Sequence, residues 1–215
     1  MEYLIFGPVL LMSIVIHEVA HAWQARREGD FTADRLGRIT LNPLPHLDPF
    51  GSVILPLILI FTQSGVFFGW AKPVPVDPGN YRELKAGDIR VSMAGIVSNL
   101  ALALIFTLVG TGLALLGPGG VDPILLDVCL LAITVNLMLA FFNLIPIPPL
   151  DGSHVVHRLL PDPLAQAYRR MGRFGFLVII ALVFVPPFRG VLFAVLSPVF
   201  VLRDAAAFWF MRLWS

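Results

Sequence analysis

The chain alternates between long apolar stretches and short polar segments. Three apolar stretches are plain, and they cover residues 3 to about 24, 91–116 and 123 to about 146. A helix needs about 20 consecutive apolar residues to cross the hydrocarbon core of a bilayer, so each stretch is predicted to span the membrane once. Two shorter apolar runs, at residues 174 to about 188 and 191–202, are predicted to form a tight helical hairpin.

Basic residues divide the connecting segments into two kinds. Both flanks of the apolar segment 53–70 are rich in arginine and lysine, whereas the linker 117–122 contains neither. Because basic residues concentrate on the cytoplasmic side, the first span is predicted to run inward, the second outward and the third inward again. Segment 53–70 then enters and leaves on the cytoplasmic face, as a re-entrant or interfacial element. The basic residues are Arg26, Arg27, Arg35 and Arg38 before this segment and Lys72, Arg82, Lys85 and Arg90 after it.

Two pieces beside that segment are predicted to be extended. Residues 36–41 alternate apolar with polar or small residues, which is the period of a strand. Residues 67–76 are aromatic and interrupted by proline, which suits an edge strand. The predicted fold class is an all-α polytopic membrane protein with a three-helix core, a C-terminal helical hairpin and a small membrane-associated β element. We expect residues 1–215 to form a single domain, because no repeat, low-complexity tract or flexible linker divides them.

Composition supports this membrane assignment. Hydrophobic residues make up 57% of the chain, charged residues make up 13%, and the mean hydropathy is +0.84. A soluble domain carries about 25% charged residues, so this chain lacks the polar surface needed in water. The net charge of +1 provides no basic field for nucleic acid. We therefore expect a lipid bilayer, and no nucleic acid, as its partner.

The first span contains the sequence His17-Glu18-Val19-Ala20-His21, an HExxH pattern. Residues four apart share one face of a helix, so both imidazoles can reach one metal ion while Glu18 acts as a general base. The pattern also recurs by chance in structural helices. Within an apolar span, however, three ionisable groups are expensive and need a shared partner, which a metal cation provides.

Catalytic zinc usually takes three protein ligands, so a third has to come from elsewhere in the chain. Asp122 and Asp127 fall at the outer end of the third span, the wrong side of the membrane. Asp151 follows the inner end of that span, level with the two histidines, and is the geometric choice. The acidic candidates near apolar segments are Asp48, Asp88, Asp122, Asp127 and Asp151.

A proline cluster precedes Asp151. Pro146, Pro148 and Pro149 remove backbone donors and disfavour helix in the residues before them, so the third span is predicted to unwind there. The unwound backbone could pair with an extended peptide substrate. The alternative is a plain proline-rich helix terminus.

Together the two motifs resemble the site-2 protease family of intramembrane zinc metalloproteases. Its later motif is matched by Asn143, Pro146, Pro148, Asp151 and Gly152, and residues 94–99 resemble its AGxxxN element. Residues 41–51 and 69–76 resemble the compact bacterial branch, and the likeness covers about residues 8–158. The chain has no insertion long enough for the PDZ or CBS domains of some members, so regulation through them is not expected.

The resemblance implies that His17, His21 and Asp151 bind one Zn²⁺ per chain and that Glu18 activates the attacking water. Asn143 is a candidate oxyanion donor or substrate-backbone contact, with a helix-capping or helix-packing amide as its alternative. The implied substrate is a membrane protein cut in or near a transmembrane segment. The implied location is the bacterial cytoplasmic (inner) membrane, with the active site toward the cytoplasmic side.

Other readings and residues stay open. A membrane metal transporter or metal-sensing subunit could use the same ligands, but it would have no need of Glu18. Asn99 and Asn136 suit hydrogen bonds between helices, and His46 suits either a structural loop role or a contact with substrate. His154 and His157 could replace a ligand, although both are expected beyond the membrane edge. The sequence leaves the oligomeric state undetermined.

Overall fold

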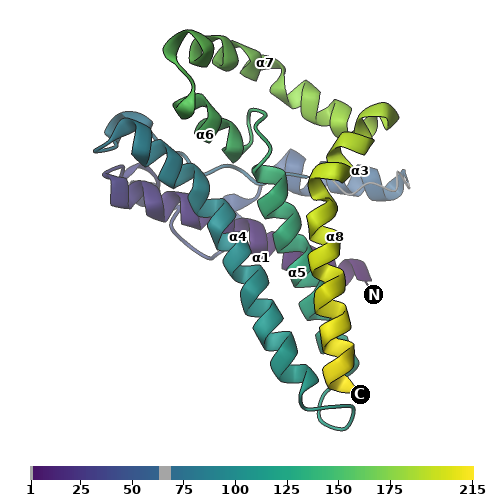
Figure 1. Cartoon of the computed structure of the whole chain (residues 1–215). Helices are drawn as coiled ribbons and strands as arrows, with labels where there is room; N and C mark the ends of the chain where they lie inside the picture. The colour runs from purple at the N-terminus through teal and green to yellow at the C-terminus, as the bar shows by residue number, and fades with distance from the viewer. Residues whose placement is uncertain (1, 63–68) are drawn as a thin grey trace.

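The computed structural model describes residues 2–62 and 69–215, and the regular structure in these residues is entirely helical (Figure 1). The elements are α1 (Glu2–Glu28), α2 (Thr32–Arg35), η1 (Leu44–His46), η2 (Pro49–Ile54), α3 (Leu55–Phe61), η3 (Pro78–Asn80), α4 (Leu84–Ala114), α5 (Pro123–Asn143), α6 (Asp151–Leu159), α7 (Asp162–Phe184) and α8 (Pro186–Trp214).

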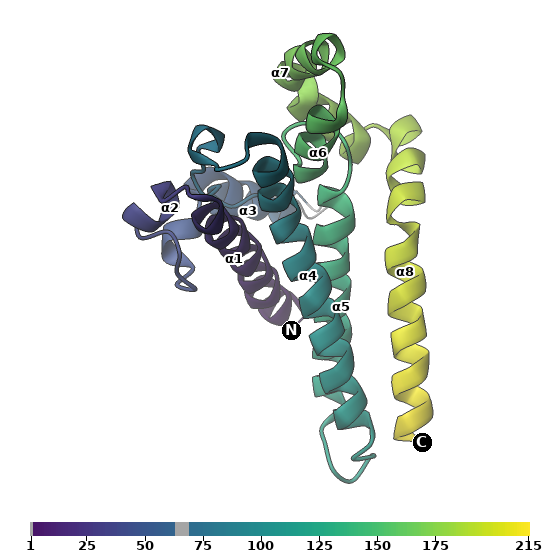
Figure 2. The same cartoon turned by 60° about the vertical axis from the view of Figure 1, so that its left-hand side comes forward.

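Four of the described helices are long and apolar enough to cross a bilayer. They are α1, over Ile5–Glu28, together with α4, α5 and α8. Helix α1 packs against α4 and α5, and α8 packs along α5 and α4 (Figure 2). The protein is therefore an integral membrane protein with a three-helix core, as the apolar stretches predicted.

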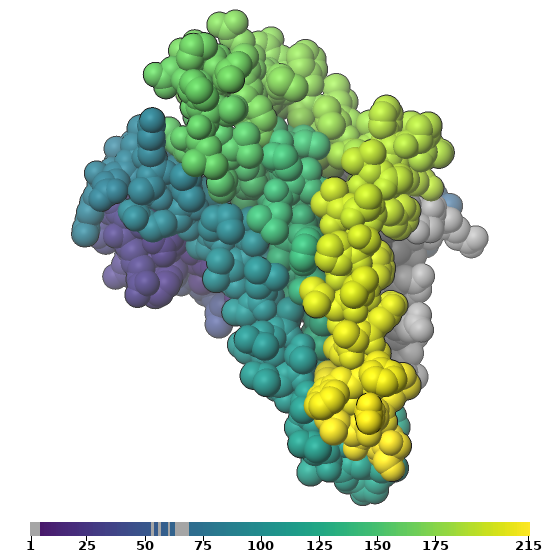
Figure 3. Space-filling model, in the orientation of Figure 1, coloured from purple at the N-terminus to yellow at the C-terminus, as the bar shows by residue number. Residues whose placement is uncertain are grey.

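The lower half of the bundle is held by an apolar core between α4, α5 and α8. Gly110 of α4 lets the Phe210 ring lie against its backbone, because a β-carbon there would overlap that ring. Helix α8 runs along α5 and the lower part of α4 (Figure 3). The buried residues of this core are Ala103, Ala114, Leu126, Cys129, Ile133, Leu137, Leu196, Val199, Ala206 and Phe210.

Helix α7 crosses the upper end of α5 and α8 instead of running beside them (Figures 1 and 2). It rests on the proline turn that follows α5. The Tyr168 hydroxyl donates a hydrogen bond to the Pro146 carbonyl at 2.7 Å. A β-carbon at Gly175 would overlap the Pro148 carbonyl, so only glycine lets the two backbones meet. The unwinding predicted from the prolines is confirmed, since α5 ends at Asn143 and α6 begins at Asp151.

The predicted C-terminal hairpin of two short runs differs from the structure. Helix α8 is a single helix of 29 residues that includes the closing stretch 205–214, and α7 is not among the four membrane-length helices. Arg189 lies between the two predicted apolar runs. In the structure it lies inside α8 and donates hydrogen bonds to the Val183 and Phe184 carbonyls at the end of α7. The break comes earlier, where Pro186 occupies the first turn of α8.

The predicted β element is not supported, because no strand occurs in residues 2–62 or 69–215. Part of the prediction, residues 67 and 68, lies outside the described residues. Residues 69–77, called the extended segment below, have neither helix nor strand. Pro73 and Pro75 have no N–H group to offer a ladder. The neighbouring loop contacts the segment through a side chain instead, since Arg38 donates to the Lys72 carbonyl at 2.9 Å.

The apolar segment after residue 48 forms a π-helical turn, η2, that leads into α3. Element η2 has 6 residues and α3 has 7. Their combined helical length is roughly 20 Å, which is less than the ~30 Å thickness of the hydrocarbon core. In Figure 1, α3 runs across the direction of α5 and α8. Residues 63–68 of the predicted re-entrant or interfacial element lie outside the described residues.

Asp30 fixes the extended segment to the end of α1. Its side chain is only 1% exposed and accepts hydrogen bonds from the Thr32 N–H at 3.0 Å, the Asp77 N–H at 2.7 Å and the Asn80 amide at 3.0 Å. Burial raises the pKa of Asp30, but these hydrogen bonds outweigh it and hold the pKa below its ordinary value.

Asp30→Asn is therefore expected to destabilise the protein at neutral pH. Hydrogen bonds to a charged group contribute about 1.5–3 kcal/mol, so Tm should fall by about 5 °C. A depressed pKa stabilises only while the carboxylate is ionised, so the difference in Tm from wild type should close as pH falls below about 4. Thermal unfolding in detergent measures both, with Asp34→Asn, which removes a partly exposed ion pair to Arg26, as the matched control. Equal Tm values at pH 7 would contradict this role for Asp30.

Candidate metal centre

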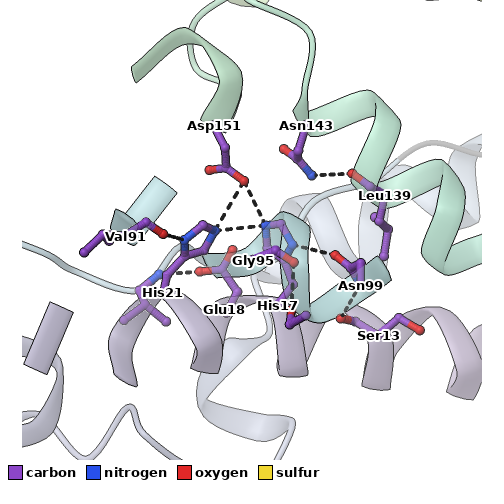
Figure 4. A network of polar contacts seen from close by, with 12 residues as sticks. Ser13, His17, Glu18, His21, Val91, Gly95, Asn99, Leu139, Asn143 and Asp151 are labelled. Atoms are coloured by element: carbon purple, nitrogen blue, oxygen red, sulfur yellow. Dashed lines mark hydrogen bonds and ion pairs between the residues drawn. The ribbon is translucent and has the colours of Figure 1, made fainter. Parts of the chain in front are cut away.

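Three ligand atoms from two distant parts of the chain converge beside the second half of α1. The Nε2 atoms of His17 and His21 lie 3.0 Å apart, and Asp151 Oδ2 lies 3.2 Å from the first and 3.3 Å from the second (Figure 4). Among the described residues, these three form a group that could hold a metal ion. The structure thus brings together the three residues that the sequence predicted as ligands.

Helix α4 approaches this group because residue 95 is glycine. A β-carbon at Gly95 would overlap the imidazoles of both His17 and His21. The two rings stand edge to face, with their planes at 83° and their centroids 4.6 Å apart. Gly95 therefore lets the α4 backbone form a wall of the site, which the sequence pattern did not reveal.

Each imidazole is held through its other nitrogen. His17 Nδ1 donates to the Asn99 side-chain oxygen at 2.6 Å, and His21 Nδ1 donates to the Val91 carbonyl at 2.7 Å. Both partners are acceptors, so each Nδ1 carries the hydrogen and each Nε2 presents a lone pair toward Asp151. Hydrogen bonds of this kind orient metal-binding histidines in general.

Asn99 is held in turn by a buried polar network that joins α1, α4 and α5. Its amide nitrogen donates to the Ser13 carbonyl at 3.3 Å and to the Asn136 side-chain oxygen at 2.8 Å. Asn136 donates to the Ser13 hydroxyl at 3.0 Å and to the Ala132 carbonyl at 2.9 Å. Both asparagines are fully buried, and their oxygens are assigned by these donors. The prediction of hydrogen bonds between helices is confirmed, and one of them reaches a candidate ligand.

The donor set fits zinc. Two nitrogen lone pairs and a carboxylate oxygen within 3.3 Å of one another repel unless a cation lies between them. Asp151 Oδ2 is buried and has no hydrogen-bond donor among the described residues. Two histidines and one carboxylate are a usual ligand set of catalytic zinc, and tetrahedral bonds of about 2.0–2.2 Å place ligand atoms roughly 3.4 Å apart. The observed separations are close to that value.

Asp151 owes its place to the short helix α6, of which it is the first residue. The far end of α6 is tied to α4, because Arg158 Nε donates to the Asp88 carboxylate at 2.5 Å and His154 Nδ1 lies 3.5 Å from it. Asp88 is only 4% exposed, so its carboxylate is buried at the junction of the two helices, whereas Arg158 and His154 are partly exposed. His154 thus contacts Asp88, and neither His154 nor His157 belongs to the ligand group.

The other acidic candidates lie elsewhere. Asp48 accepts hydrogen bonds from the Phe50 and Gly51 N–H groups and caps η2. Asp122 caps α5 in the same way, and Asp127 lies in the first turns of that helix. His46 is buried in its loop, where its Nε2 donates to the Thr40 carbonyl at 3.0 Å. Like these aspartates, His46 is outside the ligand group.

Glu18 lies beside the histidines and is held by the extended segment. Its Oε2 accepts a hydrogen bond from the Val74 N–H at 2.7 Å. The sequence predicted Glu18 as the base but gave no sign of Val74, because a backbone donor depends on the path of its loop. The hydrogen bond fixes the carboxylate at the edge of the site, where α1 and the extended segment meet.

Asn143, the last residue of α5, lies beside Asp151 in Figure 4. Its amide nitrogen donates to the Leu139 carbonyl of its own helix at 2.9 Å. In this structure, therefore, the side chain makes a contact at the end of its own helix, in line with the helix-capping alternative that the sequence had left open.

A His–His–Asp donor group beside a glutamate, within a bundle of membrane-length helices, is the arrangement expected of a membrane-embedded metalloprotease. Comparison with known sequences identifies the family. The profile of peptidase family M50 matches residues 120–185, which contain Asn143 and Asp151. The chain is 40% identical to YwhC of Bacillus subtilis (strain 168) over 194 residues, covering 87% of this chain and 82% of YwhC.

Two further relatives are the Rip2 proteins of mycobacteria. Each is 30% identical to this chain: the protein of Mycolicibacterium smegmatis over 82% of this chain and 65% of its own length, and that of Mycobacterium tuberculosis (strain H37Rv) over 95% and 78%. All three relatives carry provisional names as zinc metalloproteases. No solved structure matches the chain significantly.

The chain belongs to peptidase family M50, the site-2 protease family, and has its compact form. It is a zinc metalloprotease, and the resemblance drawn from its motifs is confirmed.

Asn99→Leu is expected to weaken zinc binding by about 10–100-fold, because His17 loses the acceptor that sets its tautomer. Competition with a chromogenic chelator measures the dissociation constant. Thr107→Val is the matched control, since Thr107 lies about two turns further along α4, where its hydroxyl donates to the Ala103 carbonyl of its own helix at 2.8 Å. A zinc affinity equal to that of wild type would show that Asn99 serves helix packing alone.

Proposed function

We propose that this protein is an intramembrane protease that hydrolyses a peptide bond in or near the transmembrane segment of a membrane-protein substrate. The observation that carries the proposal is the convergence of His17, His21 and Asp151 beside Glu18, within membrane-length helices. In this proposal the two histidines and Asp151 hold one zinc ion per chain. Zinc at such a site lowers the pKa of water to ~7 and polarises the carbonyl that is attacked.

The protein groups then have separate roles. Glu18 accepts the proton of the attacking water and returns it to the departing amine, which is the task of a general base followed by a general acid. The Val74 N–H keeps the Glu18 carboxylate in place for both transfers. Asn143 donates to the substrate carbonyl or backbone, and for this its amide has to exchange the Leu139 carbonyl for the substrate.

The proposed location is the bacterial cytoplasmic (inner) membrane, with residues 1–215 as one domain. Helices α1, α4 and α5 form the catalytic core, and the site lies toward the cytoplasmic side. Arg26 and Arg27 lie in the last turn of α1, at the cytoplasmic surface in this proposal. His17 lies ~14 Å along the helix axis from Arg26, so the site sits below the cytoplasmic surface. Residues 49–61 serve as a re-entrant or interfacial element, which their short helical length supports.

Glu18→Gln is expected to lower the rate of cleavage by at least about 10³-fold, because the amide cannot accept the proton. The test uses a pool of synthetic membrane-spanning peptides, about 24 residues long, in nanodiscs with mass-spectrometric detection of products. Zinc content should stay at wild-type level, whereas Asp151→Asn should lose zinc. Glu83→Gln, an exposed change at the start of α4, is the matched control. Cleavage by Glu18→Gln at the wild-type rate would overturn the role of Glu18 as the base, whereas zinc binding without any cleavage by the wild-type protein would favour a metal transporter or sensor.

The proposed topology predicts a labelling pattern. In a Cys129→Ala background, single cysteines at Arg35, Glu83 and Gly119 are all at exposed positions. Membrane-impermeant maleimide should reach positions 35 and 83 from one side of the membrane and position 119 from the other. If positions 35 and 83 label from opposite sides, the segment between them spans the membrane.

A further inference from the structure

An apolar cavity of about 470 Å³ lies between α1 and the start of the extended segment. One wall is the N-terminal half of α1, with Gly7, Leu11 and Ile14. The opposite wall contains Ser52, Trp70 and Ala71. None of these residues is among the candidate zinc ligands.

The wall opposite α1 presents an apolar surface to the cavity. Ser52 has its hydroxyl engaged, since it donates to the Trp70 carbonyl at 2.8 Å and accepts from the Asp48 N–H at 3.0 Å. The Trp70 ring lies against Gly51, where a β-carbon would overlap it. That ring also packs against Phe50 and Phe176, with centroids 5.8 and 5.9 Å away.

The cavity lies along the same two elements as the candidate active site. Gly7, Leu11, Ile14 and Glu18 follow one another at spacings of four, three and four residues, so they share one face of α1. On the opposite wall, the chain runs from Trp70 and Ala71 to Val74, which donates its N–H to Glu18. The same helix face and the same segment therefore enclose first the cavity and then the carboxylate.

From this shared helix face and segment we infer that the cavity is a subsite for large apolar side chains of the substrate's membrane segment, next to the peptide bond that is cut. The inference rests on the proposed function. A segment drawn from the bilayer and unwound at the site still carries leucine-like and aromatic side chains, and these need an environment as apolar as lipid. An apolar cavity of roughly 150 Å³ holds a benzene-sized group, so this one has room for two or three such side chains.

Gly7 provides a direct test, because it lines the cavity and a β-carbon there would meet no atom within 4 Å. Gly7→Phe fills the cavity from its wall without a clash at the helix. Gly7→Ala adds the same backbone restriction with little filling. Gly112→Phe is the matched control, since Gly112 is equally open but lies exposed on α4, away from the cavity.

The probes are two fluorescent peptides of about 24 residues, alike except for a central Leu-Phe-Leu or Ala-Ala-Ala. Their binding in nanodiscs is measured on the Glu18→Gln form, so that neither is consumed. We expect the Leu-Phe-Leu peptide to bind about ten-fold more tightly. Gly7→Phe should reduce this preference to about two-fold or less, whereas Gly7→Ala and Gly112→Phe should retain it.

Cleavage of the same two peptides on an otherwise wild-type background should show the same shift in preference. An unchanged preference in Gly7→Phe, or equal binding of both peptides before any change, would overturn the subsite. Failure of the proposed function would look different, since the wild-type protein would then cleave neither peptide while the binding comparison remained readable.

Discussion

The structure depends above all on the cost of placing polar side chains inside a lipid bilayer. Helix α1 carries Ser13, His17 and His21 on its apolar span, and a partner from another helix meets each of them. Asn99 and Asn136 pass hydrogen bonds from α4 and α5 to α1, and the turn after α5 brings in Asp151. An unpaired polar group at this depth is costly, so the helices have to pack in a way that gives each polar side chain its partner. The same packing sets the geometry of the donor group.

Carboxylates, instead of a neighbouring strand, accept hydrogen bonds from the backbone of the extended segment. Its prolines remove donors at alternate positions, and the N–H groups that remain at Val74 and Asp77 are taken by Glu18 and Asp30. Glu18 belongs to α1, and Asp30 lies two residues after the end of that helix. The segment is thus tied by side-chain hydrogen bonds to the same helix that carries the histidines. Backbone hydrogen bonds from the Trp70 and Lys72 N–H groups to the Gly51 and His46 carbonyls hold its first part, and no strand is formed.

Much of this arrangement could be predicted from the sequence, because it depends on local spacing. The four-residue interval of His17 and His21, and the position of Asp151 after a span that ends in prolines, are both readable along the chain. Gly95 and Val74 were not, since their importance arises only when α4 and the extended segment meet α1. The strand prediction failed for a related reason: alternation describes an extended backbone but does not tell whether its donors face a neighbouring strand or a carboxylate.

Helix α7 links the two parts of the site that α1 does not supply. Two consecutive residues make the connection: Gly175 lies against the Pro148 carbonyl in the turn before Asp151, and Phe176 packs on the Trp70 ring in the cavity wall. Helix α7 therefore packs both on the turn that precedes Asp151, the candidate third ligand, and on Trp70 in the cavity wall. The two histidines of α1 are placed by contacts with α4 and α5 instead, so the donor group and the cavity depend on two separate sets of helix contacts.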